Sequence, residues 1–345
     1  MKHRNKRLAT LSLTTILLSG LVACGEAAGE SSSGADEKLV PVKMMLFQGQ
    51  AYRLPIVVAD KEGIFADHGI DVELIDQPSG LTGGQSMKAT KADVSHISAA
   101  TLLPAWQAGD EFPYFCGGID VLQTSLVAAT NSDLPSTEAG ASWEEVLQSL
   151  EGKKIGIQTP VGSGLQLLFA EALASAGVTD VTYVNMGATT TTVKAALENG
   201  SIDVAQINPP GTQMLEAAGY GKRLVYLPDG PSVYADYWGS GLVAQREWLE
   251  QEPRVAAAFC DATQEALDFI TDSANVEASA KMLSEDTGIP MDASKLVVEN
   301  VYSDFSAELP AESTLTRTLD GYVDLGIIKP NPMPAFNELV MPPAG

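Results

Sequence analysis

The chain has 345 residues, a length that allows two ordinary domains or one large one. It carries 44 acidic against 21 basic residues, a formal net charge of −23, and such an acidic surface argues against nucleic acid or anionic lipid head groups as direct partners. Its three histidines and three cysteines form no Cys/His cluster, so we expect neither a metal site nor a cofactor.

The first 23 residues have the composition of a secretory signal. Basic residues precede a short apolar run, Leu11 to Val22, which falls below the about 20 apolar residues that span a bilayer. The run ends in Leu21-Val22-Ala23-Cys24-Gly25, which resembles the lipobox of bacterial lipoproteins. That resemblance implies a signal peptide at 1–23, lipidation of Cys24, and a chain anchored at the extracytoplasmic face of the cell membrane. The alternative is an ordinary signal peptide that contains Cys24.

A tether is predicted next, at residues 24–38. The segment is rich in Gly, Ser, Ala and Glu and has no apolar periodicity, so it cannot bury enough surface to become ordered. Removal of residues 1–23 would take away four basic residues and leave the mature chain four charges more negative. We expect the folded part to begin near Leu39.

From Val40 onward the sequence alternates between strand and helix patterns. Strands are predicted at Val40–Leu46, Asp71–Ile75, Asp93–Ile97, Tyr114–Gly118, Ser125–Thr130, Lys154–Gln158, Val181–Asn185 and Val204–Ile207. Helices are predicted at Leu54–Lys61, Gln85–Lys91, Leu102–Ala108, Trp143–Leu150, Leu165–Ser175, Thr192–Asn199, Val255–Thr271, Val276–Glu285 and Leu315–Leu325. This alternation predicts an α/β fold with parallel sheets covered by helices on both faces, followed by a helical C-terminal segment.

Two such blocks predict two lobes. A turn-rich segment, Asn131 to Ser136, precedes the second block, and a return segment lies near Tyr237 to Ala244. We assign residues 39–125 and 245–345 to lobe I and residues 126–244 to lobe II. The chain would then cross between the lobes twice, an arrangement that permits hinge closure around a ligand. The alternative is a rigid pair of lobes.

Four motifs in chain order carry a family resemblance. The run Gly63-Ile64-Phe65-Ala66-Asp67-His68-Gly69-Ile70-Asp71-Val72-Glu73 resembles a signature of the nitrate/sulfonate/taurine-type solute-binding proteins of ABC transporters, whose relatives bind thiamine pyrimidine precursors. We expect Gly63 to end the first helix, Phe65 to pack the turn, and Gly69 to permit the start of the second strand. The segments starting at Lys91, Leu150 and Leu197 resemble further family motifs, although Lys91 stands at the usual glycine position. The resemblance covers roughly residues 40–285.

The resemblance implies a type II, two-lobed periplasmic-binding-protein fold with two hinge crossings. It implies an extracytoplasmic solute-binding subunit of an ABC importer, which is not an enzyme. Its partners would be a small-molecule ligand and the permease subunits, with the membrane reached through the lipid anchor, and we expect a monomer. Two alternatives stay open, a lipoprotein that senses its ligand for a receptor and an enzyme of the pyrimidine-synthesis type.

Candidate ligand contacts follow from the rule that ligands bind beyond the carboxyl ends of the strands. The first strand leads to Gln48, Gln50, Tyr52 and Arg53; the third leads to Ser98 and Thr101; Thr124 lies at the first crossing. Arg53 could pair with an anion, or it could be a solvated surface charge.

The loop Thr159-Pro160-Val161-Gly162-Ser163-Gly164 is the sharpest local feature, because it joins a strand to a helix N-terminus. Its free amides would favour a negative or polar ligand group at Thr159, Gly162, Ser163 and Gly164; the alternative is a plain helix cap by Ser163. Asn208 follows another strand. Near the return crossing, we expect Trp238 to contact the ligand and Tyr234 to pack the hinge.

The predicted ligand is a small polar or anionic organic solute, such as a sulfonate, nitrate or taurine-like molecule. Backbone amides and hydroxyls suit a singly charged or neutral head. The alternative is a neutral heteroaromatic, such as a thiamine pyrimidine precursor, held by Tyr52 and Trp238. Cys116 and Cys260 stand in apolar surroundings, which favours buried free thiols, although a single disulfide between them stays open.

Overall fold

The computed structural model describes residues 38–77, 83–187, 189–330 and 332–344. Residues Lys38–Gly345 belong to one compact unit. The predicted signal peptide, the lipid site at Cys24 and the tether up to residue 37 lie outside the described residues and stay predictions. Within the described part of the chain, no helix combines the length and apolarity needed to cross a bilayer.

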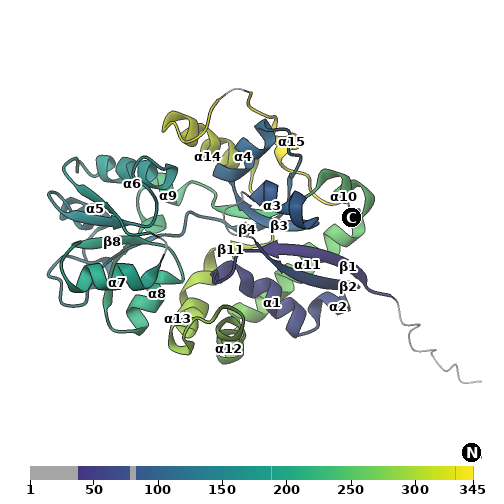
Figure 1. Cartoon of the computed structure of the whole chain (residues 1–345), viewed down its shortest axis with the longest axis horizontal. Coiled ribbons are helices and arrows are strands. Elements are labelled where there is room, and N and C mark those ends of the chain that lie inside the picture. The colour runs from purple at the N-terminus through teal and green to yellow at the C-terminus, as the bar shows by residue number, and fades with distance from the viewer. Residues whose placement is uncertain (1–37, 78–82, 188, 331, 345) are drawn as a thin grey trace, which may run out of the picture. The chain divides into compact units, whose positions relative to one another are not determined.

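The first sheet has six strands in the order β11-β4-β10-β3-β1-β2. These strands are β1 (Val40–Leu46), β2 (Ile70–Asp76), β3 (Val94–Ser98), β4 (Tyr114–Ile119), β10 (Ser240–Ala244) and β11 (Phe305–Ser306). The intervening helices are α1 (Leu54–Lys61), α2 (Ile64–Asp67), α3 (Gly83–Thr90) and α4 (Ala99–Gln107), with a 3-10 turn at Ala51–Arg53. This sheet lies on the right of Figure 1.

The second sheet has five strands in the order β7-β6-β8-β5-β9 and lies on the left of Figure 1. Its strands are β5 (Ser125–Ala129), β6 (Lys154–Ile157), β7 (Thr182–Asn185), β8 (Val204–Ile207) and β9 (Gly221–Tyr226). Its helices are α5 (Trp143–Gln148), α6 (Gly164–Ser175), α7 (Thr190–Glu198), α8 (Gly211–Ala217) and α9 (Ser232–Ala235).

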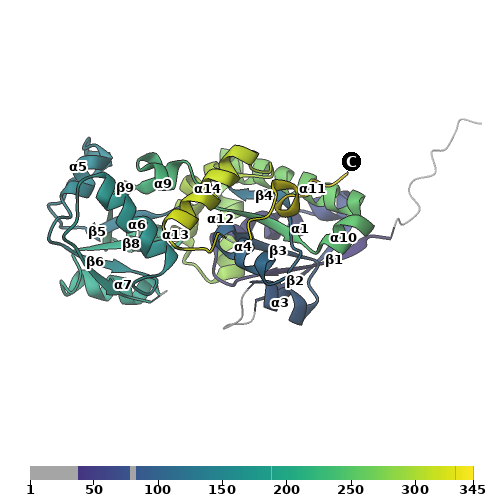
Figure 2. The ribbon, with the colours of Figure 1, turned by 90° about the horizontal axis from the view of Figure 1, so that it is seen from above.

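The C-terminal segment is almost entirely helical, as predicted. It contains α10 (Arg246–Gln251), α11 (Pro253–Thr271), α12 (Val276–Thr287), α13 (Met291–Val301), α14 (Glu312–Asp324) and α15 (Phe336–Leu339). Helices α11, α12 and α13 bury their apolar faces with α1 against the six-stranded sheet. Helix α14 lies over the region between the two sheets (Figure 2), and Ile327, just beyond it, contacts Gly164 at the start of α6.

Both sheets are mixed, whereas the alternation of strands and helices predicted parallel sheets. Strand β10 runs antiparallel to β3 and β4, and β5 runs antiparallel to β8 and β9. These two strands directly follow the two passages between the sheets. Strands β5 and β10 therefore enter their sheets directly from the opposite lobe. Successive strands run parallel only when a crossover connection, usually a helix, brings the chain back to the same end of the sheet, and neither strand is reached by such a connection.

The chain passes between the sheets twice, from β4 to β5 and from β9 to β10. The two passages touch, since a Cβ on Gly239 would lie 2.3 Å from the carbonyl oxygen of Val121 and 2.8 Å from that of Ile119. Strand β10 pairs in the six-stranded sheet, although the predicted lobe II, residues 126–244, includes it. The division into lobes stays a proposal, and its second boundary belongs before Ser240.

The glycines of the first motif occupy left-handed backbone positions, as predicted. Gly63 follows α1 with φ 79°, and Gly69 precedes β2 with φ 76°. Phe65 is buried between them, and its ring centroid lies 4.9 Å from that of Phe259. Lys91 also has a left-handed φ, 54°, which explains why glycine is the usual residue of the motif at this position.

Candidate ligand-binding site

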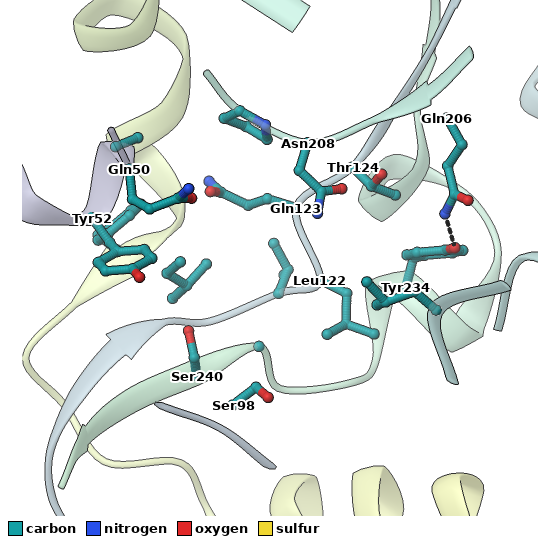
Figure 3. Close-up of a pocket in the computed structure, with 17 residues that line it drawn as sticks. Gln50, Tyr52, Ser98, Leu122, Gln123, Thr124, Gln206, Asn208, Tyr234 and Ser240 are labelled. Atoms are coloured by element: carbon teal, nitrogen blue, oxygen red, sulfur yellow. Dashed lines mark hydrogen bonds between the residues drawn. The ribbon is translucent and has the colours of Figure 1, made fainter. Parts of the chain in front are cut away.

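A cavity of about 180 Å³ lies where the two sheets face each other across the crossings. Residues from the carboxyl ends of β1, β3 and β8 and from both passages form its wall (Figure 3). The lining residues are Gln50, Ala51, Tyr52, Ser98, Ile119, Val121, Leu122, Gln123, Thr124, Leu165, Gln206, Asn208, Pro209, Tyr234, Gly239, Ser240 and Phe305. This volume is below the ~300–1,000 Å³ of pockets for drug-sized ligands.

Carboxamides and hydroxyls dominate the polar part of this wall. In Figure 3 the amides of Gln50, Gln123 and Asn208 lie along one side of the space, and the hydroxyls of Ser98 and Ser240 lie along the other. Every described side chain that lines the cavity is formally uncharged. Because an amide both donates and accepts hydrogen bonds, the wall can match a ligand that carries both kinds of group.

His96 supports the wall from behind. It lies on β3 in the six-stranded sheet, and its ring stacks on Tyr52 with centroids 4.4 Å apart and planes 25° apart. Its Nε2 lies 3.2 Å from the Ser240 hydroxyl. Burial lowers the pKa of His96 to about 3, so the imidazole is neutral at physiological pH. The ring can therefore orient Tyr52 and Ser240 without adding charge to the cavity.

Tyr234 closes the end of the cavity formed by the second sheet. The Gln206 amide donates a hydrogen bond of 3.0 Å to the Tyr234 hydroxyl (Figure 3). Burial raises the pKa of Tyr234, so its phenol stays protonated and can donate in turn. Tyr234 and Tyr52 thus place one aromatic ring in each half of the cavity.

Acidic residues lie just behind the first passage. Gln123 lines the cavity and donates a hydrogen bond of 2.9 Å to the Asp304 carboxylate, which also accepts a hydrogen bond from the Tyr226 hydroxyl. Burial raises the pKa of neighbouring Asp120 to about 6, and the negative charge of Asp304 adds to this effect. The electrostatic surroundings of this side of the cavity are therefore negative, which disfavours an anionic ligand.

Five predicted contact residues do come together at the cavity. Gln50, Tyr52, Ser98, Thr124 and Asn208 all line it, although they come from four separate segments of the chain. Their contact with a ligand stays a proposal.

Two other predicted contacts point elsewhere. Thr101 lies behind the wall, where its hydroxyl is 3.1 Å from that of Ser98. Gln48 donates to the Asp76 carboxylate at the end of β2. Neither side chain lines the cavity.

Arg53 does not line the cavity and is paired with two carboxylates, so its predicted pairing with an anionic ligand stays a prediction. Its side chain is 5% exposed, and the guanidinium binds Asp286 through Nε at 2.6 Å and Nη2 at 3.0 Å, and Asp76 through Nη1 at 3.1 Å. The hydrogen bond and charge of Asp286 raise the pKa of Arg53. With its charge compensated by two carboxylates, the side chain ties the end of β2 to α12.

In the loop before α6, the Gly162 amide and the Ser163 hydroxyl are already hydrogen-bonded to neighbouring side chains. The Gly162 amide donates to Gln166 Oε1 at 2.9 Å, and the Ser163 hydroxyl donates to the Thr159 hydroxyl at 2.8 Å. Ile327 packs where a side chain on Gly164 would stand, and only the next residue of the helix, Leu165, reaches the cavity. None of Thr159, Gly162, Ser163 and Gly164 lines the cavity, and their predicted contacts with a ligand stay predictions.

The two aromatic residues near the return passage lie differently from what the sequence predicted. Trp238 is 1% exposed and packs edge-on against Tyr114 with ring centroids 4.5 Å apart, while its backbone amide donates to Thr318. Tyr234, expected to pack the hinge, lines the cavity. The reason is Gly241, whose missing side chain leaves room for the Trp238 ring against strand β10.

Some lining residues were missed by the sequence analysis. Gln206 lies two residues before Asn208, so the two-residue period of a strand could have placed both on one face. Leu122 and Gln123 belong to the first passage, where no local periodicity indicates which side chains point inward, and Ser240 is the first residue of β10. As for metals, the described residues hold no group of three or more His, Cys, Asp or Glu side chains that could bind an ion.

A family sequence model described as NMT1/THI5 like matches residues 50–275. No curated protein matches the chain at a significant level. Several solved structures are similar. The periplasmic aliphatic sulphonate-binding protein SsuA from Escherichia coli gives a TM-score of 0.69, with 16% identity, covering 88% of this chain and 92% of that one.

Two further structures extend the comparison. The periplasmic sulfonate-binding protein SsuA described for a sulfonate ABC transporter of Methylobacillus flagellatus gives a TM-score of 0.64, with 19% identity, covering 88% of this chain and 92% of that one. The periplasmic nitrate-binding protein NrtA from Synechocystis PCC 6803 gives 0.63, with 15% identity, covering 86% of this chain and 84% of that one. At these identities the likenesses show the fold, and they confirm the predicted periplasmic-binding-protein fold.

Proposed function

The chain belongs to the NMT1/THI5-like family, and on that premise we propose that it is the extracytoplasmic solute-binding subunit of an ABC importer, held at the membrane by a lipid on Cys24. It acts as a monomer, captures a small molecule between its two lobes and delivers it to the permease subunits. It performs no chemistry on the solute. The proposal is supported by the fold shared with the sulfonate- and nitrate-binding proteins and by a cavity beside two passages that can serve as a hinge.

The solute we propose is uncharged, planar and rich in hydrogen-bonding groups, for example an amino-substituted heteroaromatic ring. The single observation that carries this choice is the uncharged, carboxamide-rich wall formed by the described lining residues. Arg53, the cation expected to meet an anion, is compensated by Asp76 and Asp286. The Tyr52 and Tyr234 rings offer apolar faces in the two halves of the cavity.

A small sulfonate is the second candidate. Ser98 lines the cavity and is the N-cap of α4, and its side chain accepts no hydrogen bond from a backbone amide of the helix. The first amides of α4 could therefore receive a singly charged oxygen. The sulfonate-binding proteins among the structural relatives favour testing this class beside the neutral one.

A thermal-shift screen of the purified protein tests the proposal. The panel pairs aminated heterocycles with sulfonates and nitrate of similar size, each at low and high salt. A ligand at 100 times its Kd adds about 2.7 kcal/mol of stability. We expect the best hits among the neutral compounds, with affinities that change little with salt, because no ion pair is formed.

Two variants locate the site. Asn208→Ala should weaken binding of the best hit at least about tenfold, since it removes a carboxamide from the wall. Ser163→Ala is the matched control and should leave the affinity unchanged, because Ser163 bonds to Thr159 outside the cavity. Tightest binding by anions, with affinity that falls as salt rises, would replace the neutral solute with the sulfonate. A loss of affinity in Ser163→Ala but not in Asn208→Ala would show that the site lies elsewhere.

A further inference from the structure

Two cysteines lie side by side where strand β4 meets helix α11. The Cys260 thiol donates to the carbonyl oxygen of Phe115 at 3.5 Å, and Phe115 is bonded directly to Cys116. The Cys116 thiol donates to the carbonyl oxygen of Ala307 at 3.4 Å. Both residues pack in one apolar cluster, and the rings of Phe115 and Phe259, with centroids 6.1 Å apart, join the same strand to the same helix.

An irregularity in β4 explains why Cys116 faces this helix. Leu242 of β10 pairs with Cys116 and Val243 pairs with Tyr114, so Phe115 has no residue opposite it. Consecutive side chains of a regular strand point to opposite faces, but a bulge of this kind re-aims them. Phe115 and Cys116 can therefore both pack in the cluster that contains α11.

We propose that Cys116 and Cys260, thiols in this structure, form a disulfide in the exported protein. The bond would join β4, the last strand before the first passage, to α11, which follows the return passage and strand β10. The loop from residue 116 to residue 260 contains every strand of the five-stranded sheet and both passages. Closing so long a loop restricts the unfolded chain strongly. The inference rests on the extracytoplasmic location and does not depend on the identity of the solute.

The bond forms by thiol–disulfide exchange. The two thiols lose their hydrogens, one S–S bond forms, and two electrons pass to the disulfide of an extracytoplasmic thiol oxidoreductase, which leaves as two thiols. Burial raises the pKa of the Cys260 thiol, and Cys116 is its nearest thiol partner. Since the thiolate is the attacking species, exchange takes place before α11 packs, and the finished bond is then protected from reductant in the folded protein.

The test uses the full chain with Cys24→Ser, which leaves only the two cysteines in question. The protein is unfolded in urea and refolded with either oxidised glutathione or a reductant, and free thiols are then trapped with a maleimide before peptide mapping. We expect the peptides of Cys116 and Cys260 to be linked after oxidation, with a mass lower by two hydrogen atoms. The oxidised form should melt several degrees higher than the reduced form.

The single variants Cys116→Ser and Cys260→Ser separate the bond from packing. Each should melt at the same temperature under both conditions, because each loses one thiol and cannot form the bond. Solute affinity should be equal in the oxidised and reduced forms, since neither cysteine lines the cavity. Recovery of both cysteines as maleimide adducts or glutathione adducts after oxidative refolding would overturn the proposal. So would equal melting temperatures of the oxidised and reduced protein.

Discussion

His96 should make this protein lose stability as the pH falls below 6.5, and replacing it should remove that loss. Its folded pKa of about 3 lies far below the usual value of 6.5, because the ring is buried. Between these two pH values the unfolded chain binds a proton that the folded protein does not accept. Lowering the pH therefore stabilises the unfolded state relative to the folded one, and above pH 6.5 the effect disappears.

The magnitude follows from the size of this pKa difference. At pH 5 the unfolded histidine is almost fully protonated, and the linkage amounts to about 2 kcal/mol of lost unfolding free energy relative to pH 7.5. In the His96→Gln variant this contribution is absent. The variant is expected to be less stable than the wild type at pH 7.5 by about 1 kcal/mol, since the contacts with Tyr52 and Ser240 weaken.

Urea unfolding followed by tryptophan fluorescence at pH 7.5, 6 and 5 measures the effect. His68→Gln is the matched control, because His68 lies nearer the surface, 2.9 Å from Glu265. The wild type should lose about 2 kcal/mol more than His96→Gln between pH 7.5 and pH 5. Equal losses in the two proteins would mean that His96 is not buried as a neutral ring. The His96 imidazole should add no pH dependence to solute affinity over the same range, because it stays neutral in the folded protein.

Three further changes test the structure. Arg53→Met leaves Asp286 without its cation and should cost about 3 kcal/mol of unfolding free energy in urea titrations; lost solute binding at unchanged stability would restore Arg53 to the ligand site. Gly239→Ala forces a Cβ to 2.3 Å from the Val121 carbonyl oxygen and should destabilise by about 2 kcal/mol. Gly140→Ala, which has open space around its Cβ at φ +94°, measures backbone strain without a clash, whereas Gly239 has no left-handed φ and its cost comes from the clash; unchanged stability in Gly239→Ala would argue against contact between the passages. Asp120→Asn should raise the melting temperature at pH 7 but not at pH 4, because the raised carboxyl pKa of about 6 makes its contribution to stability disappear as the pH rises through that value; a variant less stable than the wild type at pH 7 would contradict this reasoning.

The local pattern of the sequence was sufficient for most elements of the fold. Strand β1 and helix α1 have the predicted bounds, and the left-handed Gly63 and Gly69 were expected from the motif between them. These features depend on side-chain periodicity and backbone freedom within a few residues. The direction of β5 and β10 was not predicted, because it depends on how the chain returns between two sheets.

The predicted site also has a part that depends on local sequence, the location of the cavity, and a part that depends on distant contacts, its charge. The rule that ligands lie beyond strand ends brought Gln50, Ser98 and Asn208 to one cavity, since it needs only the order of strands along the chain. The charge of that cavity was decided by contacts far apart in sequence. Arg53 is compensated by Asp286, 233 positions away, and no local pattern indicates such a pair.

By itself, the sequence therefore determined the family, the fold class and the segments that surround the cavity. The tertiary structure decided which side chains face the cavity and which are already paired. Trp238 packs beside Gly241 away from the cavity, whereas Tyr234, four positions earlier, lines the cavity and bonds to Gln206. Packing and hydrogen bonding between distant segments set these side-chain orientations, and the local sequence pattern does not indicate which distant segments meet.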